Sequence, residues 1–206
     1  GHTLVVRTLL DNGADHGAKT FKNEDQPLHF ASYSGHHQVV KALLAAGANP
    51  NAEDISGKTP LHDGARMGKV EVVKLLLAAG ANINDQTKSG NSPLHWAANK
   101  GRDKVVDYLL KNGAQVNLLD KNDATALHDS AIAKSLAVVR LLLAAKIEVN
   151  QRDYKKRTAL HHLALSGKSE IVKALINAGI NVDVADKDGC LYTHLRAHET
   201  LRYLVC

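Results

Sequence analysis

Apolar residues recur along the chain with a fixed period of 33 residues, and each period holds two apolar segments separated by polar positions. In the second segment the pair Val72-Val73 is followed by Leu75-Leu76-Leu77 and then by Gly80-Ala81. This spacing places the apolar side chains on one face of a helix, and glycine in the left-handed conformation commonly ends a helix. The same second helix is predicted around Val39-Val40, Val105-Val106, Val138-Val139 and Ile171-Val172.

The first apolar segment of each period begins with a capping sequence. In Thr59-Pro60-Leu61-His62 the threonine can accept a hydrogen bond from an unpaired helix amide, and the proline takes the first helical position, where no N–H is needed. The histidine recurs every 33 residues, at His29, His62, His95, His128, His161 and His194. Polar segments such as Asp54-Ile55-Ser56-Gly57 read as tight turns before these helices. Each unit is therefore predicted as turn, helix, helix and loop.

Helices of about ten residues are unstable alone, so each unit must bury its apolar face on the next one. The segments Lys58-Thr59-Pro60-Leu61-His62 and Asn91-Ser92-Pro93-Leu94-His95 resemble ankyrin repeats, and the resemblance covers nearly the whole chain. It implies an all-α solenoid of stacked helix-turn-helix units with short β-turn or hairpin fingers. It also implies that the fingers and first helices line a concave face, which binds proteins in most members of the family.

Residues 1-206 are predicted to form a single repeat domain. Five full units, called units 1 to 5 below, are expected at residues 22-54, 55-87, 88-120, 121-153 and 154-186. Residues 1-21 supply only a second helix, and residues 187-206 form a partial or capping unit in which Thr193 takes a core leucine position. Because the sequence starts inside a repeat, we expect it to be a fragment of a longer protein.

Two lysines and one insertion interrupt the regular pattern. Lys134 stands where Gly68 connects the two helices of unit 2, and Lys146 stands where Gly80 ends the second helix. Because lysine enters the left-handed conformation less readily than glycine, we expect the turns of unit 4 to be reshaped. The connection before the first helix of unit 1 is one residue longer than its counterparts, and the extra residue is placed within residues 19-25.

Composition and charge narrow the setting of the protein. The chain is 44% hydrophobic and carries a formal charge of +5, with both signs interspersed rather than in one basic block, so nucleic acid is not indicated. No apolar run approaches the roughly 20 residues that span a bilayer, and no signal peptide is evident. The only cysteines are Cys190 and Cys206, and no Asn-x-Ser/Thr signal occurs. We therefore expect an intracellular protein, cytoplasmic or nuclear, in a reducing compartment and away from membranes.

No catalytic, cofactor or metal site is expected. Six of the twelve histidines belong to the 33-residue series, and packed helices lie about 8–10 Å apart, whereas metal ligands must meet within about 2 Å of one ion. We interpret these histidines as caps that bond to the neighbouring backbone. His198-Glu199 starts like a zinc-protease helix, but Arg202 stands where the second histidine is required. The chain is not predicted to be an enzyme.

Positions that vary between units while the framework stays constant are the candidate contacts with a partner. The position after each histidine and the position three residues later are the most mixed. The resemblance places the second of these positions, its neighbour and the finger tips on the binding face, and aromatic and arginine residues dominate interface hot spots. The candidate partner-binding residues are Tyr33, Arg66, Met67, Trp96, Asn99, Lys100, Tyr154, Lys155 and Arg157.

Each candidate also has a structural alternative. Trp96 is either a partner anchor or a residue that packs between helices, and the same holds for Phe30. The basic residues of the later fingers either steer an acidic segment of a partner or are ordinary solvated charges; they are Lys121, Arg152, Lys155, Lys156 and Arg157. Asn150, eight residues after Leu142, resembles the sites of the asparaginyl hydroxylase of animal cells, although an asparagine there can instead tie its loop to the next unit.

The function predicted from the sequence is a protein-protein interaction module that binds a protein or peptide on its concave face and finger tips. One alternative is a regulatory or substrate-recruiting segment of a larger enzyme. Another is nucleic-acid binding, which the pI near 9.2 suggests and the mixed charge pattern does not support. The sequence leaves the identity of the partner, the source organism and the oligomeric state open.

Overall fold

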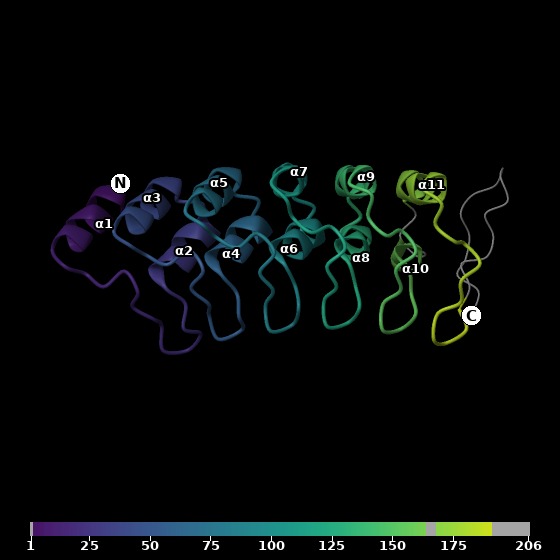
Figure 1. The fold of residues 1–206 in the computed structure, drawn as a ribbon, viewed down its shortest axis with the longest axis horizontal. Coiled ribbons are helices and arrows are strands. Elements are labelled where there is room, and N and C mark those ends of the chain that lie inside the picture. The colour runs from purple at the N-terminus through teal and green to yellow at the C-terminus, as the bar shows by residue number, and fades with distance from the viewer. Residues whose placement is uncertain (1, 164–167, 191–206) are drawn as a thin grey trace.

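The computed structural model describes residues 2–163 and 168–190, and this part of the chain contains eleven α-helices in two rows (Figure 1). The first helices of units 1 to 5 are α2 (Pro27–Ser34), α4 (Pro60–Arg66), α6 (Pro93–Asn99), α8 (Ala126–Ile132) and α10 (Ala159–Leu163). The second helices are α3 (His37–Ala45), α5 (Val70–Ala78), α7 (Asp103–Lys111), α9 (Leu136–Ala144) and α11 (Ser169–Asn177). They are preceded by α1 (His2–Asp11), which stands in the row of second helices.

Each row of helices stacks on itself from one unit to the next. In the row of first helices α4 contacts both α2 and α6, and in the row of second helices α5 contacts both α3 and α7. The two helices of a unit also contact each other. α1 packs on α3, as predicted for residues 1-21. The expected all-α solenoid of stacked helical units is therefore confirmed.

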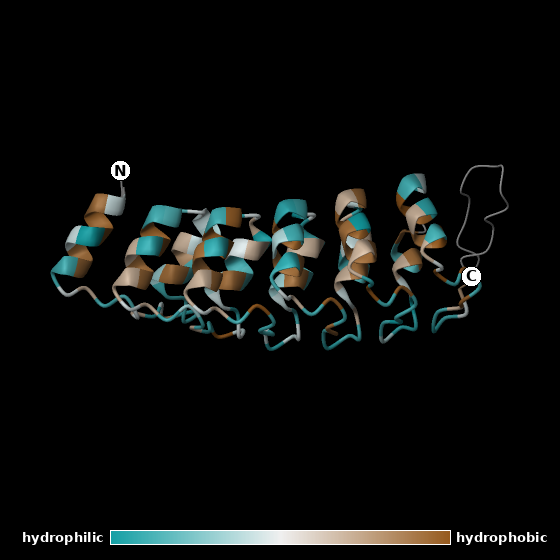
Figure 2. Cartoon of the chain, turned by 45° about the horizontal axis from the view of Figure 1, so that its top comes forward, coloured by the Kyte–Doolittle hydropathy of each residue, from teal (hydrophilic) through white to brown (hydrophobic). Residues whose placement is uncertain are grey.

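The leucine before each histidine lies in the centre of the stack. These leucines are at most 2% exposed: Leu28, Leu61, Leu94, Leu127 and Leu160. Second helices add residues such as Val73 and Leu76, which are fully buried. Figure 2 shows apolar residues on the packed helices and mostly hydrophilic residues in the turns. Because burial of one such side chain stabilises by about 1.5–3 kcal/mol, the contacts between units hold the fold together.

The repeated histidines close the first helices and also join consecutive units. In unit 2, the Thr59 amide donates to Nδ1 of His62 at 3.1 Å, and Nε2 of His62 lies 3.0 Å from the carbonyl oxygen of Asn91 in the next unit. A carbonyl oxygen only accepts, so Nε2 carries the proton and the ring is neutral. The same bond to the next unit joins His29 to Lys58, His95 to Ala124 and His128 to Arg157. The interpretation as caps that bond to the neighbouring backbone is confirmed for His29, His62, His95 and His128. His161 accepts a bond from the Thr158 amide of its own unit, but its Nε2 has no partner among the described residues, and His194 lies outside them.

Consecutive fingers are joined by one backbone hydrogen bond each. The amide of Ile55 donates to the carbonyl of Asn23 at 2.8 Å, and the amide of Lys88 donates to the carbonyl of Ser56 at 2.9 Å. Further along, the donors are the amides of Lys121, Tyr154 and Lys187. Within a finger, a carboxylate such as that of Asp54 accepts bonds from backbone amides two and four residues later. The fingers are therefore tight turns rather than long hairpins.

Asparagine side chains tie the loops of neighbouring units together. Nδ2 of Asn150 donates to the carbonyl of Gly179 at 3.2 Å, and Oδ1 of Asn150 accepts from the amide of Asn181 at 2.7 Å. Asn51 makes the equivalent two bonds to unit 2. The interpretation of Asn150 as a residue that ties its loop to the next unit is confirmed.

The turns of unit 4 are not reshaped, so that prediction is wrong. Lys134 and Lys146 have φ values of 55° and 59°, while the glycines at these two positions in other units range from 63° to 94°. The amide of Lys134 bonds to the carbonyl of Ala131 at 3.1 Å, as the amide of Gly68 does to that of Ala65. The surrounding helices impose the left-handed turn, and lysine adopts it at a cost of about 1–2 kcal/mol.

The first finger carries the predicted insertion. The amide of Thr20 donates to the carbonyl of Asp25, five residues later, whereas the amide of Asp54 donates to the carbonyl of Lys58, four residues later. The extra residue therefore lies inside the turn, within residues 19-25. The finger still reaches the next one, because Asn23 accepts the bond from Ile55.

The C-terminal expectations fall largely outside the described residues, which end at Cys190 and omit 164–167. His194, Thr193 and Cys206 lie outside the described residues. Cys190 is 7% exposed and disulfide-bonded. The sequence led us to expect a reducing compartment and therefore no disulfide. Within the described ranges, no helix is both long and apolar enough to cross a membrane.

Candidate partner-binding surface

The first helices α2, α4, α6, α8 and α10 and the turns before them form one side of the stack, which we call the finger face (Figure 1). The predicted site residues fall into two groups on it. The helix group lies in α2, α4 and α6 or directly after them: Tyr33, Arg66, Met67, Trp96, Asn99 and Lys100. The finger group lies in the turn before α10: Tyr154, Lys155 and Arg157. The structure thus brings these residues to the same side of the stack, at two places along it.

Arg66 and Trp96 meet at the centre of the helix group. The guanidinium carbon of Arg66 lies 5.1 Å from the centroid of the Trp96 ring, a geometry in which the cation is attracted to the ring face. The carbonyl of Arg66 accepts a hydrogen bond from Nε of Arg102 at 3.1 Å, which fixes the end of α4. Within the described residues, no acceptor bonds to the buried Nε1 of Trp96. Trp96 is therefore partly packed in the stack, and the Arg66 cation lies over its ring.

The other residues of the helix group differ in how freely they can contact a partner. Lys100 is exposed and Met67 is half-buried. Met67 borders a shallow hollow of about 200 Å³ together with Arg102. Nδ2 of Asn99 donates to Oδ1 of Asp129 at 3.0 Å, so this amide already holds a neighbouring side chain.

Apolar side chains are exposed on the first two units of the finger face. Phe30 and Tyr33 of α2 are 54% and 44% exposed, and Ile55 at the tip of the next finger is 53% exposed. Aromatic and aliphatic residues of this kind give up contact with water favourably when a partner covers them. They lie on the two units that precede the unit of Trp96.

In the finger group, Tyr154 and Lys155 are exposed, whereas Arg157 pairs with Asp153 of its own finger. Tyr154 is 56% exposed, and Nζ of Lys155 lies 5.6 Å from the centroid of the Tyr154 ring. Arg157 instead donates from Nε and Nη2 to Oδ2 of Asp153, at 2.9 and 2.7 Å, within its own finger. A bidentate pair of this kind is strong and specific in direction. Tyr154 and Lys155 are therefore better placed than Arg157 to contact a partner.

The distance between the two groups suits an extended peptide. Trp96 belongs to unit 3 and Tyr154 to unit 5, so two repeat steps separate them, or about 16–20 Å at 8–10 Å per step. An extended chain advances about 3.3 Å per residue. A segment of about six residues covers this distance along the stack, and a longer one is needed to reach from a helix to a finger tip.

Sequence reasoning gave no role to two aspartates that follow the repeated histidines. Asp63 is 3% exposed, and its Oδ1 lies 3.2 Å from Nζ of Lys58. Asp129 is partly buried, and burial raises its pKa to about 7 although the hydrogen bond from Asn99 acts in the opposite direction. The signal was present in the sequence: Lys58 precedes Asp63 by five residues, and Ala124 precedes Asp129 by the same spacing.

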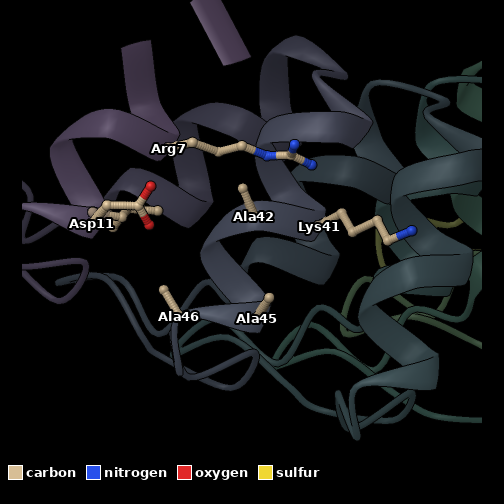
Figure 3. A pocket seen from close by; sticks show the side chains of 7 residues that line it. Arg7, Asp11, Lys41, Ala42, Ala45 and Ala46 are labelled. Atoms are coloured by element: carbon tan, nitrogen blue, oxygen red, sulfur yellow. The ribbon is translucent and has the colours of Figure 1, made fainter. Parts of the chain in front are cut away.

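A hollow of about 370 Å³ lies among the second helices, between α1 and α3 (Figure 3). It forms because Ala42 stands where Leu75, Tyr108 and Leu141 occur in other units. Figure 3 shows the side chains of Arg7 and Lys41 at its rim. The hollow belongs to the row of second helices, so it is separate from the finger face.

Comparison with known families agrees with this architecture. A family model described as ankyrin repeats (3 copies) matches residues 1–87 and 80–153, and one described as ankyrin repeat matches residues 155–187. These matches span most of the sequence, so the chain belongs to the ankyrin repeat family. Ankyrin repeats are generally protein-protein interaction modules, and domains built from them are generally non-catalytic.

Proposed function

We propose that this chain binds a partner protein or peptide on its finger face, with Arg66 and Trp96 at the centre of the contact. The observation that carries the proposal is the Arg66 guanidinium held 5.1 Å from the Trp96 ring. Arginine and tryptophan are the residue types that contribute most often to interface hot spots. Tyr33 and Phe30 supply exposed aromatic area next to this pair.

Charge on the finger tips supports a partner that carries an acidic segment. Lys88, Lys121, Lys155 and Lys156 are exposed on successive fingers, and the described residues give none of them an ion pair. Such charges accelerate encounter with an opposite charge more than they add to the final affinity. Binding should therefore weaken only modestly with added salt, whereas a steep fall would indicate nucleic acid.

Replacement of Trp96, Arg66 and Met67 together by alanine tests the proposal. Because Trp96 is half-buried, a second variant with Tyr33→Ala and Arg66→Ala leaves the Trp96 side chain in place. Both variants are compared with wild type for capture of crosslinked partners from native extract, and their unfolding is followed by circular dichroism. A matched control is Arg140→Ala with Lys173→Ala, two exposed residues in the row of second helices.

We expect the triple variant and the Tyr33/Arg66 variant to lose at least about tenfold of partner capture, while the control retains it, because hot-spot truncations commonly cost this much. Retained capture by a folded Tyr33/Arg66 variant, or equal loss in the control, would place the binding surface elsewhere on the stack.

A further inference from the structure

One lysine forms ion pairs with two carboxylates in unit 2. Nζ of Lys58 lies 3.1 Å from Oδ2 of Asp54 in the same finger and 3.2 Å from Oδ1 of Asp63 in α4. Asp63 is 3% exposed, and the Lys58 side chain is 22% exposed. A buried carboxylate needs a counterion or hydrogen bonds to remain charged. Lys58 therefore acts as an internal cation that bridges the finger to the first helix.

Unit 4 repeats the two carboxylates without the lysine. Asp120 and Asp129 occupy the positions of Asp54 and Asp63, and Ala124 occupies the position of Lys58. The backbone matches, since the amide of Asp120 bonds to the carbonyl of Ala124 as that of Asp54 does to Lys58. The alanine side chain ends at Cβ, so the ammonium group that bridges the two carboxylates in unit 2 has no counterpart in unit 4.

The two carboxylates of unit 4 have hydrogen-bond donors but no cation. Oδ1 of Asp120 accepts from the amides of Asn122 and Ala124, and Oδ1 of Asp129 accepts from Nδ2 of Asn99. Among the described residues, neither carboxylate forms an ion pair. The other units do not share this arrangement: unit 3 has Trp96 in place of the second aspartate, and the finger carboxylate of unit 5 is paired with its own Arg157.

The charges around Asp129 show what the missing cation would do. Burial, and to a lesser extent the negative charge of Asp120, raise the pKa of this carboxyl to about 7. The Asn99 amide and the positive charge of Lys100 act against this rise without cancelling it. A cation between Asp120 and Asp129 would lower the raised pKa by offsetting their repulsion, although burial would still raise it, as burial raises the pKa of Asp63 beside Lys58.

We propose that Asp120 and Asp129 form a subsite for one lysine or arginine side chain of the partner, whose charged group takes the place that Nζ of Lys58 has in unit 2. The proposal rests on the function proposed above, because it requires that the finger face binds a protein. An ammonium or guanidinium group is favoured over a metal ion because the equivalent carboxylates of unit 2, Asp54 and Asp63, already bind an ammonium group in this chain.

The subsite sets a spacing in the partner. Trp96 and Asp129 lie in consecutive units, one repeat step of about 8–10 Å apart. Three residues of extended chain cover about the same distance. The partner is therefore expected to place an apolar residue at Trp96 and a basic residue three positions away at Asp129.

The test uses the intact chain and a set of peptides. The probe is acetyl-Leu-Ser-Ser-Lys-amide, compared with peptides in which arginine, norleucine or glutamate replaces the lysine. Binding is followed above pH 8 by the fluorescence of Trp96, the single tryptophan of the chain. The variants are Asp129→Asn, which removes the charge, and Ala124→Lys, which supplies the cation from the chain itself. Carboxyl NMR shifts report the pKa of Asp129 in wild type and in Ala124→Lys.

We expect the lysine and arginine peptides to bind wild type at least about tenfold more tightly than the norleucine peptide, as charge-assisted pairs do. This preference should vanish in both variants, and the pKa of Asp129 should fall in Ala124→Lys. The pKa result also shows that this variant folds with the pair formed.

Three outcomes would each overturn the subsite. The peptides could bind without preference or not at all, the preference could survive in Ala124→Lys, or Ca²⁺ could bind at these carboxylates and abolish the preference. Loss of capture in the Tyr33/Arg66 variant would still support the finger face, so the two proposals can fail separately.

Discussion

Nε2 of His95 in unit 3 lies 3.2 Å from the carbonyl oxygen of Ala124 in unit 4, across the boundary between two units. The backbone of Ala124 thus serves the repeated framework, while its short side chain leaves Asp129 without the lysine found in unit 2. At this one position the backbone carbonyl joins two units, whereas the side chain determines which charges lie beside Asp129. Along the stack, constant residues join the units, whereas several varied residues, such as Phe30 and Tyr33, are exposed.

Removal of one repeated histidine should weaken the whole stack. His95→Ala leaves the Ser92 amide and the Ala124 carbonyl without the partner that each has now. Because both groups lie in a buried interface, we expect a loss of about 2–4 kcal/mol in the free energy of unfolding, measured by urea titration. His36→Ala, at the exposed residue just before α3, should change this free energy by less than about 0.5 kcal/mol. Equal effects of the two substitutions would show that the 33-residue histidines are not structural.

Acid should destabilise the fold through its buried histidines. Burial lowers the pKa of His62 to about 4 and lowers the pKa of His95 and His128 as well. In the unfolded chain histidine titrates near 6.5, so between pH 6.5 and about 4 the unfolded state binds more protons than the folded state. The free energy of unfolding should therefore fall as the pH falls through this window. Urea titrations across it check the direction, and a flat profile would contradict neutral buried histidines.

Asp129 should act in the opposite direction within the same experiment. Its folded pKa of about 7 lies above its usual value near 4, so the folded state binds the extra proton between these values. Its contribution is present below about pH 4 and is lost as the pH rises through 7. Asp129→Asn should remove this loss and raise the stability of the chain above pH 7 relative to wild type. An unchanged alkaline side would contradict the raised pKa.

Glycine at the two irregular positions of unit 4 should stabilise the protein. Lys134 and Lys146 hold positive φ angles that glycine adopts at no steric cost. Allowing for the greater flexibility of glycine in the unfolded chain, we expect each of Lys134→Gly and Lys146→Gly to add about 0.5–1 kcal/mol. Alanine at the same positions keeps the strain and removes the charge, so it should give no gain. Stabilisation by alanine equal to that by glycine would point to charge rather than backbone conformation.

Two predictions concern Asn150, one about its structural role and one about its modification. Asn150→Ala should destabilise the stack by about 1–2 kcal/mol, because the bonds to Gly179 and Asn181 are lost. Hydroxylation of the exposed Asn150 side chain remains a proposal from the sequence. Mass spectrometry of protein from its native cells checks it, and a uniformly unmodified Asn150 peptide would end the idea. The stability prediction does not depend on that result.

The fold was largely predictable because its determinants are local and repeated. The Thr-Pro-Leu-His sequence, the Val-Val pair and the Gly-Ala ending each specify a backbone feature within a few residues. The prediction failed at Lys134 and Lys146, where packing of the neighbouring helices overrides the preference of a single residue. In a stack of repeats, packing against the neighbouring units imposes the geometry of the turn.

The sequence indicated which positions to consider for the candidate site, but it did not predict the contacts that their side chains make. The varied columns located Arg66 and Trp96, yet only the structure shows the cation over the ring. The engagement of Arg157 with Asp153 could not be read from a list of exposed fingers. The role of Asp129 needed distances as well, because the pairing of Lys58 with both Asp54 and Asp63 identifies what Ala124 lacks.

Site-specific photo-crosslinking tests the central claim most directly. A photoreactive residue is placed at Tyr33 or Lys100 on the finger face, and at Arg140 in the row of second helices as control, because all three side chains are exposed. Each folded protein is irradiated in native extract, and the crosslinked species are compared. We predict that Tyr33 and Lys100 crosslink the same protein and that Arg140 does not. Crosslinks to a common protein from Arg140 alone, or equally from all three positions, would contradict binding on the finger face.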